Sequence, residues 1–352
     1  MPALPTYPRW SIGIGPAASS APTGEIVRAA SRKWSRRLDR PDTFAMTING
    51  RTDVAGTIGD METDIWLRRG GTLIGRNRIG VPGHKLTGTD HAMSITSADY
   101  TSILDRRLLA AGDSALDHVT VDQAQIAWLL IQATQGRTGG ALGITAGTIG
   151  FTAGAGSTGV TRERHYSPGD SIGKLITQLA AVSGGFNWII DGDLKLQVYY
   201  PSKGSANGVI LDYGGLVAEM DVAGNPGGFS NVDYVEGAQG LTPIYQATSG
   251  IGSDPRGRWE DAFSYSTVKE QTTLQEKADG LLVERARPAR VYKMRLRAGA
   301  WGGPSVLDIG DTVRVVARSG ALNISPVCRV MQIDVAITPG GDEQVDVVCE
   351  ES

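Results

Sequence analysis

The spacing in this sequence that best matches a binding motif is the run Gly154-Ala155-Gly156-Ser157-Thr158-Gly159, which fits G-x-G-x-x-G. In dinucleotide-binding folds this pattern joins a strand to a helix, and N–H groups at the start of that helix bind a pyrophosphate. The residues from Val160 to His165 begin no long helix, and Pro168-Gly169 follows soon after. We therefore predict no cofactor, and instead a flexible loop or β-arm over residues 136–159, whose length indicates either a function or order gained on binding a partner. Its candidate partner-contact residues are Gly154, Gly156 and Gly159.

The sequence contains no recognisable motif for metal binding or for a catalytic nucleophile. The four histidines lie outside H-E-x-x-H and the two cysteines outside C-x-x-C, so the common zinc signatures are missing. The sequence has neither a G-x-S-x-G elbow nor a glycine-rich loop ending in Lys-Ser or Lys-Thr. Cys328 has no histidine nearby in the sequence to act as its base. We therefore predict no catalytic residue and no metal site.

Two pairs of carboxylates could in principle serve glycoside hydrolysis, in which two acidic groups flank the scissile bond. Asp191 and Asp193 are better explained by turn chemistry, because aspartate side chains hydrogen-bond to the backbone of tight turns. Asp60 and Glu62 are better explained as part of a polar loop. A cell-wall or polysaccharide hydrolase whose site is assembled from distant loops stays open as an alternative.

Basic residues accumulate between Arg28 and Arg40, where Asp39 is the one acidic residue. The segment is either a solvated helix face or a contact with an acidic surface of a partner. The candidate partner-contact residues are Arg28, Arg32, Lys33, Arg36, Arg37 and Arg40.

The overall composition narrows the class of protein. The chain has 352 residues, 41% hydrophobic and 20% charged, which fits two or three folded domains rather than a disordered or fibrous chain. Its 47 glycines favour many turns and bulges over a helix-rich enzyme. The formal net charge of −3 provides no global basic field for counterion release, so we expect no sequence-specific nucleic acid partner.

We also expect no membrane partner. The longest strongly apolar run, Ile126 to Ile131, is far shorter than the ~20 residues that span a bilayer. The N-terminus lacks the charged and apolar regions of a signal peptide. Cys328 and Cys349 lie in apolar, strand-like runs and are expected to be buried and unpaired, as in a protein of a reducing compartment.

The N-terminal part is predicted to be an extended arm followed by a β-domain. Residues 1–24 are rich in Pro, Gly, Ala and Ser without a periodic pattern, which is typical of an arm. A short helix could follow over residues 25–38. From Phe44, apolar and polar residues alternate up to the turn Asn49-Gly50, a strong hairpin signal. We assign residues 25–96 to a first β-barrel-like domain.

Helical patterns distinguish residues 97–208, predicted to be an α/β insertion domain that contains the glycine-rich loop 136–159. A hairpin with its turn at Asp191-Gly192 follows the last helix. Thr120 has the right spacing to Gln123 to cap the second helix. The helices are predicted over residues 97–108, 120–136 and 171–183.

Strands return in residues 209–352 and are interrupted by one helix over residues 268–287, which ends at Pro288. Hairpin turns join the last strands and favour a small barrel that hides its edges. The predicted fold class is α+β and mainly β, with two small barrel-like domains, residues 25–96 and 209–352, around the α/β insertion.

Several short segments follow one another in a definite order: Leu38–Gly50, Asp64–Gly70, Ser97–Tyr100, Leu104–Arg107, Leu175–Leu179, Gly185–Trp188, Asp191-Gly192, Leu307–Val313, Arg329-Val330 and Ile333. Their succession resembles the tail-hub proteins of siphophages that infect actinobacteria. The resemblance spans roughly residues 25–350, and it is carried by the order of the segments rather than by any one of them.

The resemblance implies a structural virion protein, a tail-tip or baseplate hub with a fold like that of myophage baseplate hubs. It implies a homotrimer, in which two tube domains per subunit give six around the tail axis. The implied partners are the distal tail protein, the tape-measure protein and other tail-tip proteins. The implied location is the tail tip of the virion, after synthesis in the host cytoplasm.

Many larger relatives continue into a peptidase or carbohydrate-binding region. This chain ends at Ser352, directly after the last predicted strand, so we expect a hub without that region and carry over no catalytic residue.

Two alternatives stay open beside the hub. A tail-associated hydrolase would clear host cell walls in a zymogram, and the clearing would be lost on changing one Asp or Glu. A receptor- or sugar-binding tail protein would bind host cells in isolation. Its candidate stacking residues, which are as easily core residues, are Trp10, Trp259 and Trp301.

Overall fold

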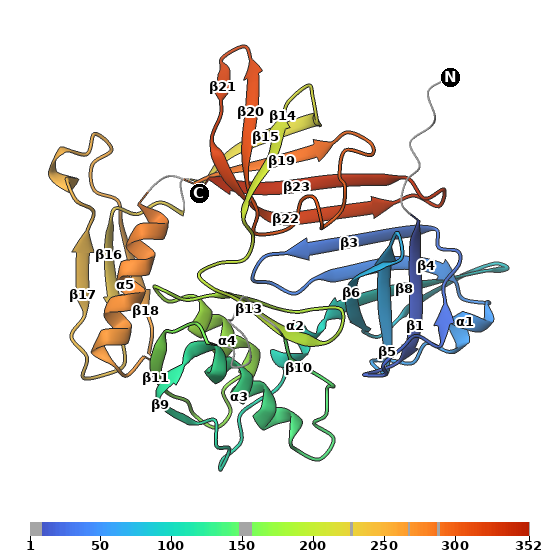
Figure 1. Ribbon diagram of the computed structural model, residues 1–352, viewed down its shortest axis with the longest axis horizontal. Helices are drawn as coiled ribbons and strands as arrows, with labels where there is room; N and C mark the ends of the chain where they lie inside the picture. Colours follow the sequence, from blue (N-terminus) through green and yellow to red (C-terminus); the bar gives the residue numbers. More distant parts are fainter. Residues whose placement is uncertain (1–8, 148–156, 226–227, 267, 287–288, 352) are drawn as a thin grey trace.

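Two half-sheets, one from each end of the chain, make up most of the computed structural model, which describes residues 9–147, 157–225, 228–266, 268–286 and 289–351 (Figure 1). The N-terminal half-sheet, with the one-turn helix α1 (Asp53–Gly56), consists of β1 (Trp10–Pro16), β2 (Gly24–Glu25), β3 (Ser31–Arg37), β4 (Thr43–Asn49), β5 (Thr63–Arg69), β6 (Thr72–Ile79), β7 (Gly83–Thr87) and β8 (Asp90–Asp99). The C-terminal half-sheet consists of β14 (Ala206–Asp212), β15 (Val217–Asn225), β19 (Ala289–Leu296), β20 (Thr312–Ser319), β21 (Leu322–Ile324), β22 (Val327–Ile337) and β23 (Glu343–Glu351).

The two half-sheets are joined into one 15-stranded sheet by antiparallel pairing of β3 with β22, from Arg37 opposite Gln332 to Arg32 opposite Ile337. The main path of the sheet runs β15-β19-β23-β22-β3-β4-β8-β6-β5-β1-β2. Buried side chains from both halves share one hydrophobic cluster, in which Trp34 of β3 lies with Val335 of β22. The predicted class, α+β and mainly β, is confirmed, whereas the domain boundaries at residues 97 and 209 stay predictions.

Two N-terminal predictions are wrong. Strand β1 replaces the predicted arm over residues 10–16, because Trp10, Ile12 and Ile14 are buried and pair along the whole length of β5. The glycines between these residues weaken the strand pattern in the sequence. Gly13 is nevertheless required, because a Cβ at this position would come within 2.7 Å of the Pro22 side chain.

The segment predicted as a short helix over residues 25–38 contains strand β3. Its Arg and Lys residues favour a helix intrinsically, but pairing with β4 on one side and β22 on the other overrides that propensity. The alternation from Phe44 onward is confirmed as β4. The turn at Asn49-Gly50 leads into α1 and not into a hairpin, since β4 pairs with β3 and β8.

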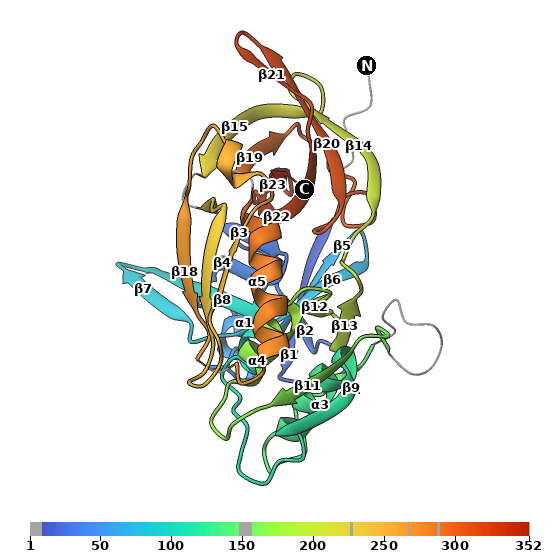
Figure 2. The same cartoon turned by 90° about the vertical axis from the view of Figure 1, so that its left-hand side faces the viewer.

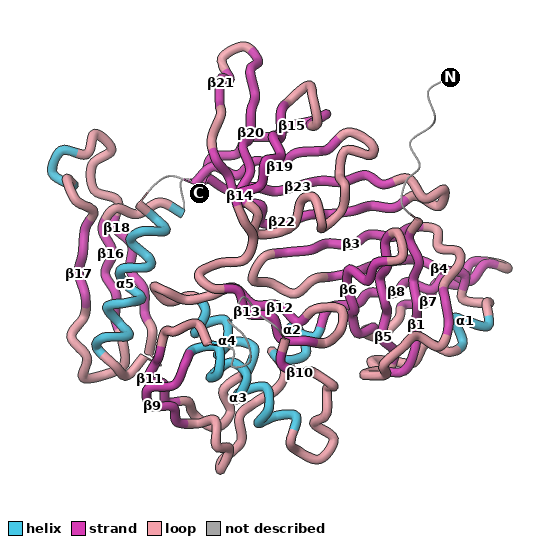
Figure 3. The backbone as a smooth tube through the Cα atoms, in the orientation of Figure 1, coloured by secondary structure: helices cyan, strands magenta, loops and turns pink. Residues whose placement is uncertain are grey.

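The insertion has its own hydrophobic core, separate from that of the half-sheets. Asp122, and not Thr120, caps α3, because its side chain accepts the Ala124 N–H. Figure 3 shows helices α2, α3 and α4 close together in the insertion. The elements of the insertion are α2 (Tyr100–Leu104), β9 (Asp117–Asp122), α3 (Gln123–Gln135), β10 (Thr145–Ala146), β11 (Thr161–His165), α4 (Ile172–Ala180), β12 (Asn187–Ile190) and β13 (Lys195–Tyr199).

A small layer of three strands and a helix projects from the C-terminal half-sheet, between β15 and β19; we call residues 228–286 the outer unit. The predicted helix over residues 268–287 is found as α5, whose Leu274 and Ala278 pack with Val235. Figure 2 shows α5 running along one face of its three strands. The elements are β16 (Val232–Glu236), β17 (Ile244–Ala247), the 3₁₀ turn η2 (Ile251–Ser253), β18 (Glu260–Ser264) and α5 (Gln271–Arg285).

The glycine-rich loop is more ordered than predicted over residues 136–147. Leu142 and Ile144 are buried in the core of the insertion, and β10 pairs in parallel with β13. Gly154 and Gly156 lie outside the described residues, so their predicted contacts stay predictions. In the described part of the chain, no helix is long and apolar enough to cross a membrane.

The two thiols are expected to resist alkylation in the native protein. Cys328 and Cys349 are both 0% exposed and unpaired, as predicted. Burial raises the pKa of Cys328 to about 12 and raises that of Cys349 as well, so little of the reactive thiolate forms at neutral pH. Mass spectrometry after maleimide treatment checks this: no label is expected on native protein and two labels on unfolded protein. Rapid native labelling would contradict the burial.

Candidate functional site: the junction of the half-sheets and a cationic groove

The basic segment 28–40 is divided between two faces of the sheet, because successive strand residues point to opposite sides. Arg32 and Arg36 of β3 lie on the core-facing side, and Lys33 and Arg37 lie on the other. The segment therefore forms no single helix face. Arg28 and Arg40, on either side of β3, are exposed.

The Arg36 side chain is paired with carboxylates inside the protein. Its guanidinium lies 2.9 Å from Asp308 of the C-terminal part and 3.7 Å from Asp42 beside β4. Lys203, from the segment between β13 and β14, lies 2.6 Å from the same Asp308 carboxylate. Burial opposes the charge on Arg36, but Asp308 and Asp42 outweigh it and raise its pKa, whereas burial dominates for Lys203 and lowers its pKa. We call Arg36, Asp42, Asp99, Lys203 and Asp308 the junction network.

Two acidic groups of the junction network titrate near neutral pH. Burial, with the nearby Asp99 carboxylate adding to it, raises the pKa of Asp42 to about 7 although Arg36 opposes the shift. Burial also raises the pKa of Asp99 to about 6, against hydrogen bonds from Thr101. All four carboxylate oxygens have partners: Asp42 accepts the Arg37 N–H and faces Arg36, and Asp99 accepts from Thr101 and from the Asp42 N–H. The pair therefore ties strand ends together.

The free energy of unfolding is expected to rise as the pH falls from about 8 to about 5. A carboxyl whose native pKa lies above its unfolded value binds its proton more tightly when folded, so its contribution is full below the unfolded pKa and is lost as the pH rises through about 6 to 7. Urea unfolding of wild type and Asp42→Asn across this range checks the prediction. Asp42→Asn should flatten the dependence, and the exposed control Asp221→Asn should not. Equal slopes for wild type and Asp42→Asn would contradict it.

A second polar cluster ties the insertion to both halves. The Asn187 side-chain amide donates to both carboxylate oxygens of Asp39 at 2.9 and 2.7 Å. Its oxygen accepts from Arg329 at 2.7 Å and from the Lys203 N–H at 2.8 Å. One buried asparagine at the start of β12 therefore contacts groups of the N-terminal part, of the segment between β13 and β14, and of β22.

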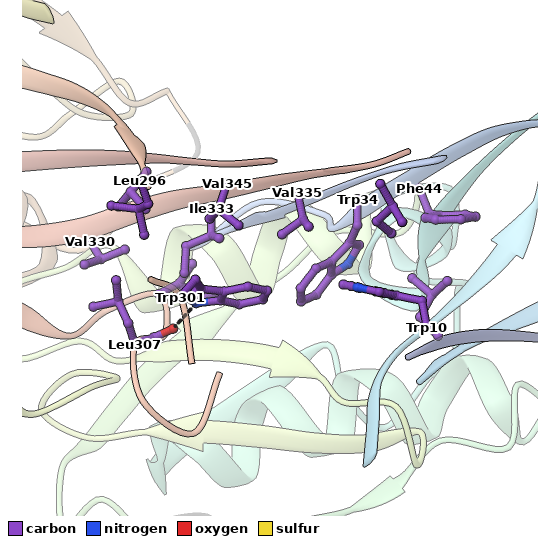
Figure 4. Packing of buried hydrophobic residues seen from close by; sticks show 14 of the residues in the cluster. Trp10, Trp34, Phe44, Leu296, Trp301, Leu307, Val330, Ile333, Val335 and Val345 are labelled. Carbon is purple, nitrogen blue, oxygen red and sulfur yellow. Dashed lines mark hydrogen bonds between the residues drawn. The ribbon is translucent and has the colours of Figure 1, made fainter. Parts of the chain in front are cut away.

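Aromatic packing completes the junction. Trp10, Trp34 and Trp301 lie in a row, with ring centroids 6.0 and 6.4 Å apart (Figure 4). Trp301 belongs to the segment between β19 and β20, so the row crosses from one half to the other. Glu343 of β23 accepts from Trp10 Nε1 and pairs with Arg69 at 2.7 Å, and Arg69 also lies over the Trp301 ring. The half-sheets are thus held by strand pairing, edge-on and tilted tryptophan contacts, and buried charge.

This placement corrects the proposed sugar platforms. Trp10 and Trp301 are 7% and 3% exposed and cannot stack on a ligand. Trp259 is 49% exposed and packs edge-on against Phe229.

A groove of about 880 Å³ lies on the outer face of β3, β4 and β8, beside α2. None of the described residues that line it is a carboxylate. Arg78 is paired with Asp64 at 2.6 Å, but the other four cations form no ion pair with any carboxylate of the described ranges, and Arg37 Nε is buried without a hydrogen-bond partner there. Its cations are Lys33, Arg37, Arg78, Arg106 and Arg107, and its apolar residues include Met61, Val81, Ile103 and Leu142. We call it the cationic groove.

Of the glycine candidates, Gly159 is the one the structure describes. It has a φ of +73°, and its N–H donates to the Asp122 carboxylate at 2.9 Å. Asp122 also accepts from Ser157 and Thr158, so the end of the glycine-rich loop is anchored at the N-terminus of α3. Its contact with a partner stays a prediction.

Neither proposed carboxylate pair forms a site. Asp191 accepts the N–H groups of Asp193 and Lys195, which confirms turn chemistry, and Asp60 and Glu62 are exposed.

Among the described residues, one cluster combines side chains of the types that bind metal ions. Glu163, His165 and Glu270 place one ligand atom each within 4.8 Å of one another. His165 is committed elsewhere, since it lies 2.8 Å from Asp117, whose hydrogen bond, with Glu163 adding to it, raises the His165 pKa.

The residues of the junction were missed by sequence reasoning except for Arg36. Asp308 and Lys203 lie far from Arg36 in the chain, and Asn187 stood out only as part of a strand. The one available signal was the Asp39–Asp42 turn beside a cluster of arginines.

The structure was compared with known proteins. No protein-family model matches the sequence, and no curated protein matches it. A tail protein from Neisseria meningitidis superposes with a TM-score of 0.68 at 14% identity, covering 97% of both chains. The chain has the fold of phage tail proteins. A prophage MuSo2 43 kDa tail protein from Shewanella oneidensis superposes at 0.67 with 13% identity, covering 97% of this chain and 98% of that one.

A third likeness extends to secretion systems. An Escherichia coli component of the type VI secretion system, which resembles the T4 bacteriophage tail proteins gp27 and gp5, superposes at 0.53 with 11% identity over 92% of this chain and 74% of that one. The baseplate-hub-like fold predicted from the sequence is therefore confirmed.

Proposed function

We propose that this chain is a non-enzymatic structural protein of a phage tail, and that it forms the hub at the tail tip. The observation that carries the proposal is the superposition on the Neisseria and Shewanella tail proteins over 97% of this chain. The match covers both half-sheets and the insertion together, so it concerns the whole architecture and not one common motif.

The junction supports a structural role. Trp34, the junction network and β3–β22 pairing hold two half-sheets in one fixed arrangement. Fixed geometry within a subunit is what a closed ring requires, because small angular errors at each subunit would prevent closure. Asp42 and Asp99, two carboxyls whose pKa burial raises, accept hydrogen bonds from the backbone and from a neighbouring side chain.

The finer part of the proposal is a homotrimer at the end of the tail tube. Three subunits with two half-sheets each place six half-sheets around the axis, matching a six-fold tube above. The distal tail protein and the tape-measure protein are the proposed neighbours, and the tail tip of the virion, after synthesis in the host cytoplasm, is the proposed location. The resemblance to siphophage hubs of actinobacteria supports this part.

Native mass spectrometry of the purified full chain tests the proposal. We expect a three-subunit species that grows with protein concentration. A protein that stays monomeric at every soluble concentration contradicts the hub. A zymogram on host cell walls tests the non-enzymatic part: clearing that is lost in Asp42→Asn would contradict it.

A further inference from the structure

The cationic groove has the chemistry of a site for an anionic, partly apolar protein surface. Lys33, Arg37, Arg106 and Arg107 bring positive charge without a described counterion. Met61 is 51% exposed and Val81, at 66%, belongs to the same wall. A patch that combines unpaired cations with exposed apolar side chains is typical of a protein interface.

The opposite charge lies elsewhere on the same molecule. Residues 25–110, which line the groove together with Leu142, hold fourteen Lys and Arg against ten Asp and Glu, whereas the outer unit holds nine Asp and Glu against five Lys and Arg. The outer unit and strands β4 to β8 lie at opposite ends of the long axis of the molecule (Figure 1). A surface at one end that complements a different surface at the other end builds heterologous, head-to-tail contacts, which close into rings.

The outer face of α5 offers a matching ligand. One side of the helix packs on its own strands, and Glu276 pairs with Arg162 of the insertion at 2.7 Å, so the flank between these two contacts is the exposed one. There Gln275, Asp279 and Val283 follow one another at four-residue spacing and form one row. Val283 is 82% exposed, and Asp279 accepts a hydrogen bond from Gln275 at 2.8 Å without an ion pair in the described chain.

We propose that the outer face of α5 in one copy docks into the cationic groove of the neighbouring copy. The carboxylate of Asp279 meets the groove cations, and Val283 packs against the apolar wall of the groove. This inference rests on the proposed ring and names the surfaces that build it.

Charge reversal on each surface tests the inference. Lys33→Glu with Arg106→Glu reverses two exposed groove cations, and Asp279→Lys reverses the charge of the helix row. Matched controls are Arg318→Glu on the projecting β20–β21 hairpin and Asp221→Lys on β15, both exposed. Sedimentation velocity over a concentration series measures self-association, and thermal melting confirms that each variant folds.

Each of the two variants is expected to weaken self-association at least about tenfold, because like charges then face each other, and the controls should leave it unchanged. The variant that combines all three changes restores opposite charges across the interface and should regain association to within about threefold of wild type.

Two results would overturn the inference alone: a groove variant that assembles like wild type, or a combined variant that fails to regain association. A wild-type chain that never self-associates would instead contradict the proposed function.

Discussion

Replacing Trp34 by alanine is expected to lower the free energy of unfolding by about 3–5 kcal/mol, the range found when a buried aromatic side chain is removed. Trp34 is 0% exposed and lies between Trp10 and Trp301. Its removal leaves a cavity where the two half-sheets meet, and rings on both sides lose their partner. Urea denaturation followed by circular dichroism measures the loss.

Trp259→Ala is the matched control for this change. Its side chain is 49% exposed and lies outside the junction, so a loss of under about 1 kcal/mol is expected. Similar losses for Trp34→Ala and Trp259→Ala would mean that the tryptophan row does not hold the halves together.

Replacing Asp308 by alanine is expected to cost about 3–5 kcal/mol, as when one partner of a buried ion pair is removed. The change leaves Arg36 and Lys203 close together without the carboxylate that both contact at 2.9 and 2.6 Å. Two like charges in a buried place repel each other and have lost their hydration.

Asp346→Ala is the control for the second change, because Asp346 pairs with Arg295 where both side chains are more than a third exposed. Exposed pairs contribute about 0–1 kcal/mol. The double variant Arg36→Met with Asp308→Ala should lose less than the sum of its single variants, because it removes one of the stranded charges. Additive losses would show that Arg36 and Asp308 do not stabilise each other.

Elements whose buried face follows from their own residue spacing could be predicted from the sequence. The alternation after Phe44, the apolar face of α4 and the turn at Asp191 were all found where the pattern placed them. Each depends on neighbours within a few residues, where spacing and turn chemistry suffice.

Elements whose structure depends on partners far away in the chain could not be predicted from the sequence. Strand β3 carries helix-favouring Arg and Lys residues, and it becomes a strand because it pairs with β4 and with β22, nearly 300 residues later. Strand β1 has the composition of a loop and becomes a strand because β5 pairs with it. The sequence likewise predicts Arg36 as a surface contact, because its partner is distant in the chain. In the structure the Arg36 guanidinium pairs with Asp308 inside the junction.

The ordered succession of segments from Leu38 onward carried more information about the fold than any motif. It predicted a baseplate-hub-like architecture, and the superpositions confirm that architecture at 11–14% identity. The cationic groove escaped notice because its cations come from β3, β6 and the segment after α2, which only folding brings together.

An averaged density map of the phage particle that carries this chain tests the central proposal most directly. We expect three copies in a closed ring at the distal end of the tail tube, with six half-sheets around the axis. A map that places the chain elsewhere in the particle, or as single copies that do not contact one another, would contradict the proposal.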